Sequence, residues 1–501
     1  MWFWEIVYTG LQIMAALFVA AVGIIFLAVI VFFVIDRLQT KDAVRRNYPV
    51  LGRFRHIFSE LGEFFRQYFF AMDREELPFN RAQRNWIEHA ADGNDGSNMM
   101  AFGSTRNLAI PGTPLFVNAA FPPLDDQYAS TEPLVIGPDA RVPYHAPSFF
   151  NISGMSFGAL SRPAVKALSR GAKEAGIWYN TGEGGLSDWH LEGGCDIVFQ
   201  IGTAKYGVRD ADGNLSDDRL RALAAHDQVR MFEIKMSQGA KPGKGGILPA
   251  GKVTPKIAEI RGIPVGKDSI SPNRHPDIAS TGELLDMIAH IREVTGKPVG
   301  FKTVVGGPDW LVEVCEEINK RGPDSAPDFI TLDGGDGGTG AAPMPLMDLV
   351  GLTVREALPM VSDILHVHGL RDRIRLVVSG KLVNPGDIAW ALATGADFIT
   401  SARGFMFSLG CIQALKCHKN TCPTGITTHD PRFQKGLVPR EKYKNVAAYA
   451  KQIKKEVEMI AHSCGVSEPR QLRRHHVRLV QSDGKAVRMD ELHPRPEAIR
   501  V

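Results

Sequence analysis

The chain has 501 residues, of which 44% are hydrophobic and 23% are charged, values that are ordinary for a folded protein with a substantial core. Its length allows one large domain with appendages, or two to three smaller domains. The formal net charge is only +3 and no basic block dominates, so we do not expect nucleic acid as a partner.

The first predicted element is a membrane-spanning helix. Residues 6–35 contain no charged residue, and a run of about 20 apolar residues is enough to cross a bilayer. We therefore predict a transmembrane anchor over residues 1–40, with a buried core helix as the alternative. A cleaved signal peptide would have a basic start and a shorter apolar core, whereas here the acidic residue Glu5 precedes the apolar run.

Basic residues after the apolar run predict its orientation. They are Arg37, Lys41, Arg45, Arg46, Arg53 and Arg55. Because positive residues that flank a membrane span stay in the cytoplasm, we predict a single pass through the inner (cytoplasmic) membrane, with the bulk of the chain facing the cytoplasm. In that reducing compartment, cysteines are more often ligands or core residues than disulfides.

A juxtamembrane helical region is predicted over residues 41–115. Within it, residues 50–70 read VLGRFRHIFSELGEFFRQYFF and place apolar residues at roughly helical spacing. Such a mixture of aromatic and basic residues could lie on the membrane surface or pack on the main domain. The sequence leaves both possibilities open.

The main domain is predicted over residues 116–430, followed by a C-terminal helical extension over residues 431–501. Eight short apolar runs end in glycine or polar residues and are followed by helical stretches. The runs cover residues 149–154, 177–182, 196–202, 231–237, 299–306, 329–334, 374–380 and 398–404. Strands that alternate with helices favour a parallel sheet, and eight of them predict an α/β fold, the (β/α)8 TIM barrel, with its chemistry at the C-terminal ends of the strands. A doubly wound open sheet is the competing interpretation.

A long loop follows the fourth run. Residues 237–255 read SQGAKPGKGGILPAGKVTP and are rich in glycine, proline and lysine. Long loops in compact domains are usually functional or disordered. At the mouth of a barrel, this loop predicts a lid or a substrate-binding segment.

Candidate site residues follow the first two runs. Gly154, Met155 and Ser156 end the first run, where small residues let a flat ligand approach the backbone; an ordinary turn is the alternative. Glu183 stands among glycines after the second run. It is either an active-site carboxylate or a solvated turn residue.

Charged residues inside two of the runs are candidates for chemistry. Lys302 lies in the apolar run VGFKTVVG, and because an isolated buried ammonium is costly, we expect it to point into the barrel or to pair. There it could stabilise an anionic cofactor ring or a carboxylate. Glu233 and Lys235 alternate in MFEIKMS and so share one face of their strand. For these two, a structural ion pair and a catalytic role are both open.

The ends of the last three runs are candidates for holding a phosphate-bearing cofactor, because the loops after the seventh and eighth strands of such barrels often bind phosphate. The candidate residues are Gly334, Gly335, Ser379, Gly380, Lys381, Ser401, Arg403 and Gly404. The alternative is that the glycines among them serve only turns.

Three cysteines lie within twelve residues, at Cys411, Cys417 and Cys422. A disulfide would leave one thiol over. Zinc would need a fourth ligand, such as His418, whereas an iron–sulfur cluster also fits, because Cys-Pro occurs in ferredoxin ligand runs. Clustered core thiols are the remaining alternative. A metal centre here could exchange electrons with a redox cofactor at the same barrel mouth.

Five stretches together resemble the FMN-binding synthase domain of glutamate synthase. They are GMSFGALS, NTGEGG, EIKMSQGAKPGKGG, DGGDGGTGA and LGCIQALKCHKNTCPTG, and they lie in the family's order between residues 150 and 430. The resemblance, which extends to stand-alone, membrane-anchored members, implies a (β/α)8 barrel that binds FMN beside a 3Fe-4S cluster. It also implies that Cys411, Cys417 and Cys422 are the ligands of that cluster.

In that family, reduced FMN delivers hydride to 2-iminoglutarate, which is made from 2-oxoglutarate and ammonia, and the product is glutamate. By position, the resemblance implies that Lys302 contacts the flavin or the dicarboxylate. It places Gln238 and Lys241 in the loop over the flavin. Glu183 would lie near the side where ammonia enters.

Departures from the family pattern bear on the sources of ammonia and electrons. No stretch resembles an amidotransferase domain, so ammonia is expected from solution or from a partner subunit. We find no dinucleotide-binding G-x-G-x-x-G unit after a strand, so a ferredoxin-like donor or a partner subunit is expected to supply electrons. Two alternatives stay open: an oxidoreductase acting on another amino acid or an N-alkylated amino acid, and a non-catalytic, membrane-tethered electron-transfer subunit.

Overall fold

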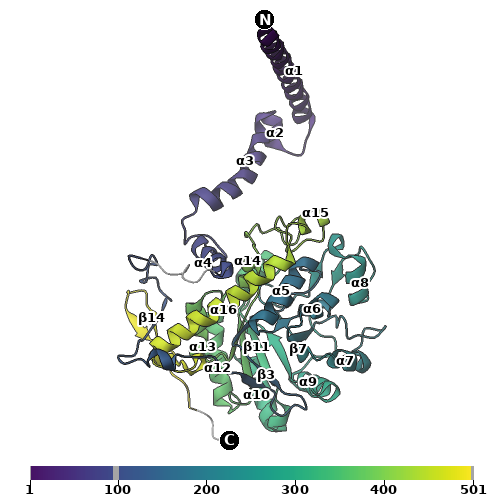
Figure 1. Ribbon diagram of the computed structural model, residues 1–501. Helices are drawn as coiled ribbons and strands as arrows, with labels where there is room; N and C mark the ends of the chain where they lie inside the picture. Colours follow the sequence, from purple (N-terminus) through teal and green to yellow (C-terminus); the bar gives the residue numbers. More distant parts are fainter. Residues whose placement is uncertain (1, 94–100, 498–501) are drawn as a thin grey trace. The chain divides into compact units, whose positions relative to one another are not determined.

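The computed structural model describes residues 2–93 and 101–497 (Figure 1). The chain divides into two compact units, Met1–Ala82 and Gln83–Val501, which we call the N-terminal unit and the barrel unit and describe separately. The division falls inside the region predicted as juxtamembrane, residues 41–115. The part of that region from Gln83 on therefore belongs to the barrel unit.

The N-terminal unit is helical. It contains α1 (Trp2–Leu38), α2 (Ala43–Asn47), α3 (Leu51–Phe65) and the π-helical turn η1 (Arg66–Phe70). In the described part of the chain, α1 is the one helix long and apolar enough to cross a membrane, and none of its most apolar window is buried. The predicted apolar helix is therefore confirmed as a candidate membrane span.

The barrel unit is built around eight parallel strands that close into a barrel. In order they are β4 (Phe150–Ile152), β5 (Tyr179–Asn180), β6 (Ile197–Ile201), β7 (Val229–Lys235), β10 (Val299–Thr303), β11 (Phe329–Asp333), β12 (Arg375–Ser379) and β13 (Phe398–Ser401). Each lies within or overlaps one of the eight predicted runs. The last strand pairs with the first, with Ile399 opposite Phe150, so the barrel prediction is confirmed and the open sheet was wrong.

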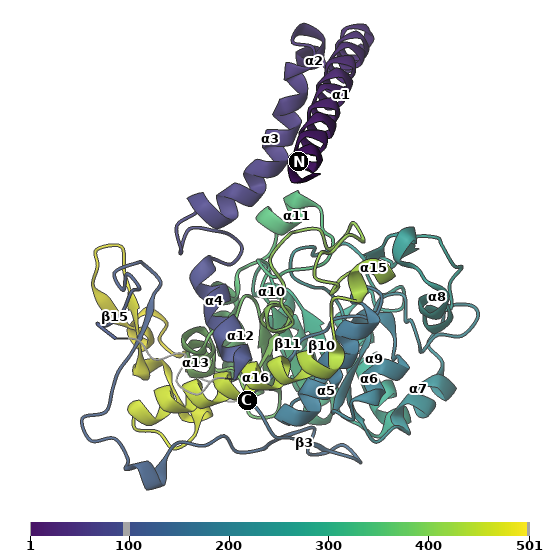
Figure 2. The ribbon, with the colours of Figure 1, turned by 45° about the horizontal axis from the view of Figure 1, so that its top comes forward.

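Helices surround the barrel. Those between or after the strands are α5 (Arg162–Ala175), α6 (Asp188–Glu192), α7 (Asp217–Ala224), α8 (Pro255–Arg261), α9 (Thr281–Thr295), α10 (Asp309–Arg321), α11 (Met344–Leu349), α12 (Val354–Val367), α13 (Pro385–Thr394), α14 (Arg403–Ser408), α15 (Pro431–Gln434) and α16 (Pro439–Ser463). Local sequence sets where several begin: Ser161, Ser280 and Asn384 accept a hydrogen bond from the first turn of α5, α9 and α13, as N-cap residues do. Figure 2 shows α16 lying along α5 on the outside of the barrel.

A short hairpin closes the N-terminal end of the barrel. It consists of β2 (Leu134–Ile136) and β3 (Tyr144–Ala146), which pair antiparallel. Buried residues of this hairpin form one apolar cluster with Trp178, Phe329 and Phe398, which lie at or just before the starts of their strands. Because that end is plugged, the open end is the one where the strands finish.

The C-terminal extension, residues 431–501, is only partly helical. After α16 come β14 (Val477–Val480) and β15 (Ala486–Arg488), which form a three-stranded sheet with β1 (Pro114–Phe116). A short helix, α17 (Met489–Leu492), follows. The prediction of a wholly helical extension was therefore wrong. The strands β1 and β14 lie far apart in the chain and pair only in the folded state. Likewise, residues 101–113, predicted as part of a helical region, form turns rather than helix, whereas α4 (Arg81–Asp92) is helical.

Candidate active site

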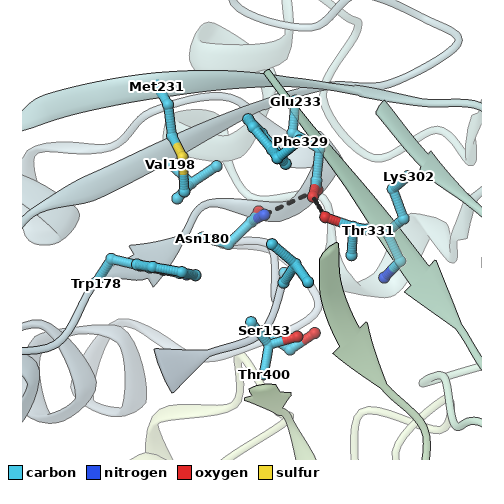
Figure 3. Close-up of a pocket in the computed structure, with 12 residues that line it drawn as sticks. Ser153, Trp178, Asn180, Val198, Met231, Glu233, Lys302, Phe329, Thr331 and Thr400 are labelled. Carbon is cyan, nitrogen blue, oxygen red and sulfur yellow. Dashed lines mark hydrogen bonds between the residues drawn. The ribbon is translucent and has the colours of Figure 1, made fainter. Parts of the chain in front are cut away.

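A buried pocket lies inside the barrel (Figure 3). Its wall includes Gly154 after β4, Asn180 on β5, Glu233 on β7, Lys302 on β10 and Thr331 on β11. These residues come from consecutive or neighbouring strands of the barrel. Closure of the barrel therefore gathers polar side chains that are dispersed over much of the sequence.

Glu233 is held by three hydrogen bonds inside the pocket. Its Oε1 accepts from Asn180 Nδ2 at 2.8 Å and from Gln200 Nε2 at 2.6 Å. Its Oε2 accepts from Thr331 Oγ1 at 2.6 Å, and Figure 3 shows the carboxylate between Asn180 and Thr331. A buried carboxylate with this many donors is fixed in position. Glu233 pairs with these residues rather than with Lys235 on its own strand.

Lys302 stays charged although it is buried. Burial alone would lower its pKa, but Asp333 and Glu233 raise the pKa above its ordinary value. Its Nζ lies 3.1 Å from Asp333 Oδ2. Asp333 also accepts from Ser379 Oγ at 2.6 Å and from the N–H of Gly239 at 2.9 Å. The expectation that Lys302 would pair is therefore confirmed, and its carboxylate partner sits at the end of the next strand.

A second charged cluster joins the long loop to the end of β7. Lys235 Nζ lies 3.0 Å from Glu183 Oε2. Burial raises the pKa of Glu183, but the charges of Lys235 and Lys241 outweigh that effect and hold the pKa below its usual value. A Cβ on Gly246 would lie only 2.0 Å from Glu183 Oε1. The loop thus passes directly over this carboxylate, and only glycine fits there.

Lys241 is a buried cation of the predicted lid. Its side chain is 4% exposed, and burial, together with the nearby charge of Lys235, lowers its pKa to about 8 although Glu183 acts in the opposite direction. A lysine with a pKa this near neutrality can hold or release a proton at physiological pH. Gln238, at the start of the same loop, is half-buried.

The glycines after β11 have backbone groups already in use. Gly334 donates its N–H to Ser379 O at 2.8 Å, and Gly335 donates its N–H to Leu352 O at 2.7 Å. Gly335 O in turn accepts from Ala240 N at 3.0 Å. The N–H groups of these two glycines are therefore occupied by the protein itself, and their Cα atoms are packed against Val354 and Gly351.

Two cations lie near Asp336, beyond the ends of β11 to β13. Lys381 Nζ is 3.4 Å from Asp336 Oδ2. Burial lowers the pKa of Arg403, against the opposing effect of Asp333 and Asp336, and a Cβ on Gly338 would lie 2.9 Å from its guanidinium carbon. The predicted residues Lys381 and Arg403 are therefore brought to one side of the mouth.

The remaining phosphate candidates differ in their surroundings. Gly380 has a φ of +140°, which favours glycine. Gly404 donates its N–H to Ser401 Oγ at 3.3 Å, and a Cβ on Gly404 would come within 2.2 Å of Tyr449 Oη. Packing against α16 is therefore enough to require glycine at position 404.

The loops that follow β4 and β5 pack closely against each other. A Cβ on Gly154 would be 3.0 Å from Asn180 Oδ1. A Cβ on Gly182 would be 2.6 Å from Ser156 N, and Met155 O accepts from Tyr179 Oη at 3.1 Å. This stretch therefore presents backbone rather than side chains to the mouth.

The three clustered cysteines are free thiols near one another. Burial, together with the charges of Cys417 and Cys422, raises the pKa of Cys411 to about 12. Cys422 differs: burial raises its pKa, but hydrogen bonds from Thr424 and Thr427 lower it more. All six cysteines of the chain are unpaired. Among the described residues, no three His, Cys, Asp or Glu side chains are grouped as a single metal ion would require.

Lys252 ties the cysteine loop to the barrel mouth. Its Nζ donates to Ala159 O at 2.9 Å and to Cys417 O at 3.3 Å. Burial lowers the pKa of Lys252 to about 8, while Cys417 and Cys422 act to raise it. His429 Nε2 lies 2.8 Å from Gly158 O. The loop with the cysteines therefore packs on the segment that follows β4.

Comparison with known proteins now identifies the family. A sequence profile of the conserved region in glutamate synthase matches residues 129–467, which is well over half of the chain. The chain belongs to the glutamate synthase family. Glutamate synthase large subunit-like protein YerD of Bacillus subtilis is 38% identical, over 96% of this chain and 98% of that protein.

Other relatives match a smaller share of the chain. Archaeal-type glutamate synthase (NADPH) of a Thermotoga species is 36% identical over 64% of this chain. This glutamate synthase family chain thus spans 60% of that relative's length. Among solved structures, a mutant of an active chimera of (S)-mandelate dehydrogenase is 12% identical, over 79% of this chain and 99% of that one, with a TM-score of 0.48. A likeness this distant carries no information on ligands.

Sequence reasoning missed several residues of this glutamate synthase family site. Asn180 and Gln200 are polar residues inside apolar runs. A polar residue in an apolar run is the signal that singled out Lys302, but Asn180 and Gln200 carry no charge and were not singled out. Asp333 lies next to the last residue of its run, and it was not recognised as the partner of Lys302. Lys252 lies in a lysine-rich loop, and no local signal separates it from its neighbours.

Proposed function

We propose that this member of the glutamate synthase family is an FMN- and 3Fe-4S-dependent oxidoreductase that reductively aminates a 2-oxo acid, with 2-oxoglutarate as the first candidate and ammonia from solution or a partner subunit. The observation that carries the proposal is the gathering of three buried lysines, Lys235, Lys241 and Lys302, at one barrel mouth beside a loop with three free thiols. The names of the relatives support the same class of activity. Because the chain spans 60% of the archaeal-type relatives, the activity of those whole proteins is itself part of the proposal.

The residues at the mouth suit FMN. Gly154 and Lys302 both line the pocket, and Lys302 supplies a fixed positive charge there. Thr400 Oγ1 is buried on the pocket wall with no hydrogen-bond partner in the described part of the chain, so it has a free group to offer a ligand. Lys381 and Arg403 are the cations that would meet the phosphate. Bound FMN would supply a hydride.

The charged residues suit a dicarboxylate and ammonia. Lys241 and Lys235 offer positive charge to carboxylate groups, and exclusion of water strengthens those interactions. Glu183 stays ionised beside Lys235 and would attract ammonium to the mouth. As ammonia condenses with the 2-oxo acid, the carbonyl oxygen leaves as water; a hydride then adds to the carbon and a proton to the nitrogen. Lys241, with its pKa of about 8, is suited to hold the proton that this last step consumes.

The cysteine loop suits an iron–sulfur cluster more than a single ion. Thiolates of a cluster each bind a different iron, so Cys411, Cys417 and Cys422 need not converge on one point. Lys252 places a positive charge beside Cys417 and Cys422, where it would offset the negative charge of bound thiolates. Electrons would enter one at a time from a ferredoxin-like donor or a partner subunit.

We also propose that α1 anchors the protein in the inner membrane, with the barrel unit in the cytoplasm. The basis is its apolar length and the basic residues that follow it.

The first experiment is anaerobic purification of the full chain in mild detergent, with absorption and EPR spectra before and after reduction. We expect a flavin spectrum and the EPR signal of an oxidised three-iron cluster. Cys417→Ser should abolish that EPR signal, whereas Cys464→Ser, which changes a free cysteine outside the cluster loop, should keep it. Flavin without iron in the wild type would refute the cluster and the route by which electrons enter.

Turnover tests the reaction itself. We expect glutamate from ammonia, 2-oxoglutarate and reduced ferredoxin, and we expect Lys302→Ala to cut turnover sharply. If no glutamate forms while another amino acid reduces the flavin, amination of 2-oxoglutarate is excluded in favour of the alternative substrate class. If Lys302→Ala leaves electron transfer intact and no 2-oxo acid is turned over, the electron-transfer alternative holds.

A further inference from the structure

Helix α3 carries an apolar face with large exposed side chains. Within the N-terminal unit, the side chains on this face are between 42% and 66% exposed; they are Phe54, Ile57, Phe58, Leu61, Phe64 and Phe65. The turn η1 continues the face with Phe69 and Phe70, which are 68% and 73% exposed. Contiguous exposed apolar surface of this kind marks an interaction site.

The helix is two-faced. Its apolar residues recur at intervals of three and four along Leu51–Phe65, which places them on one side. Ser59, Glu60 and Glu63 project from the opposite side and are exposed. A helix with a broad aromatic face and an opposite polar face has the composition of one that lies in a membrane surface.

A buried carboxylate fixes α3 to the end of α1. Asp36 is fully buried. Its oxygens accept from Arg45 Nε at 3.0 Å, from Arg53 Nε at 2.7 Å and from the N–H of Val50 at 3.1 Å. The guanidinium of Arg53 also lies 4.2 Å from the ring of Phe32. Paired guanidinium–carboxylate contacts of this kind are strong and directional, so α3 begins at the point where the apolar run of α1 ends.

Basic residues lie around that same junction. Arg37 lies in the last turn of α1, Lys41 and Arg46 lie between α1 and α3, and Arg55 and Arg66 lie on or just after α3. All five are outside the Asp36 pairs. Positive charge at this depth complements the anionic headgroups of a membrane surface.

We propose that α3 and η1 lie in the surface of the bilayer, with the apolar face at the boundary between headgroups and acyl chains, as a second membrane contact beside α1. The inference rests on the proposed anchoring role of α1, because the Asp36 junction brings α3 to the membrane only if α1 crosses it. The observations favour a lipid surface over a protein partner, since the Asp36 junction holds the start of α3 at the end of a candidate span and basic residues lie around that junction. The N-terminal unit is then a two-part membrane attachment rather than a single helix on a flexible tether.

The test is site-specific photo-crosslinking in the full chain, reconstituted in nanodiscs of phosphatidylethanolamine and phosphatidylglycerol. The photoreactive residue p-benzoylphenylalanine replaces Phe58 on the apolar face or, as a matched control, the adjacent Ser59 on the polar face, which is also exposed. A third probe replaces Phe18 in the middle of α1 and reports on the span alone. Mass spectrometry identifies the adducts.

We expect lipid adducts at position 18 and at position 58, with several-fold fewer at position 59. Lipid adducts at position 18 but equal yields at 58 and 59 would overturn the surface helix and leave the anchor intact. Cross-links from position 58 to the barrel unit or to a second copy of the chain would overturn it in favour of a protein partner. If position 18 gives no lipid adduct, the anchor itself fails, and the surface helix fails with it.

Discussion

Lys241 shows how strongly the fold changes the chemistry of one residue. Two other lysines lie close to it in the chain or in space: Lys244 is exposed, and Lys235 is paired with Glu183. Lys241 is instead buried, and its pKa falls to about 8 from an ordinary 10.5. Its charge is therefore available below about pH 8 and lost above it.

This shift predicts a pH dependence for substrate binding. A lysine is charged below its pKa and neutral above it, so the KM for a 2-oxo dicarboxylate should rise as the pH increases through about 8. Lys241→Met should raise KM about tenfold at pH 7, since a hydrogen bond to a charged group contributes about 1.5–3 kcal/mol, and should flatten this part of the profile. Steady-state kinetics between pH 6 and about 9.5 tests both effects.

The matched control for this variant is Lys244→Met, which removes an exposed lysine from the same loop. We expect Lys244→Met to keep the KM and the pH profile of the wild type. A Lys241→Met protein with an unchanged pH profile would show that another group is responsible for the titration.

At the scale of elements, the contact between α5 and α16 depends on one glycine. Gly171 lies inside α5, and a Cβ there would be 2.6 Å from Val446 and 2.7 Å from the backbone oxygen of Tyr443. Both of those residues belong to α16. The close approach of the two helices therefore has no room for a side chain at position 171.

Gly171→Ala should lower the melting temperature of the protein. Alanine normally stabilises a helix by about 0.5–1 kcal/mol relative to glycine, but forcing extra atoms into packed surfaces costs about 1–3 kcal/mol. Gly386→Ala in α13 is the control, because the nearest atom to its Cβ is 3.6 Å away, and it should leave the melting temperature unchanged or raise it. Equal effects of the two substitutions in thermal unfolding would contradict tight packing of α5 on α16.

At the scale of the whole molecule, the barrel unit contains its own core. Its strands close on themselves, and the hairpin of β2 and β3 seals one end. The sheet of β1, β14 and β15 joins residues near both limits of this unit. Among the residues that the structure describes, no strand of the closed barrel lies before β4.

The barrel unit should therefore fold without the N-terminal helices. We expect a chain starting at Ala71, which keeps α4 whole, to be recovered in the soluble fraction with the same flavin content per protein as the full chain. The full chain should be recovered with the membranes. Fractionation and absorption spectra measure both. Aggregation of the shortened chain would show that the N-terminal unit contributes to the stability of the barrel.

The barrel and several site residues could be predicted because their signals are local. Each strand is a short apolar run, and the alternation with helical stretches is legible along the chain. Lys302 could be singled out because a charged side chain inside an apolar run is costly to bury unless it is paired. The three cysteines were visible through their spacing. The sequence by itself thus determined the fold class, the apolar N-terminal helix and the family resemblance.

Only the tertiary structure decided which groups meet. The pairing of Lys302 with Asp333, the three donors on Glu233 and the contact of Lys252 with the cysteine loop join residues on different strands and loops. The pairing of β1 with β14 likewise depends on a contact across most of the chain. The low pKa of Lys241 depends on burial, which is a property of everything packed around it. Such features follow from distances between residues far apart in sequence, and no local pattern encodes those distances.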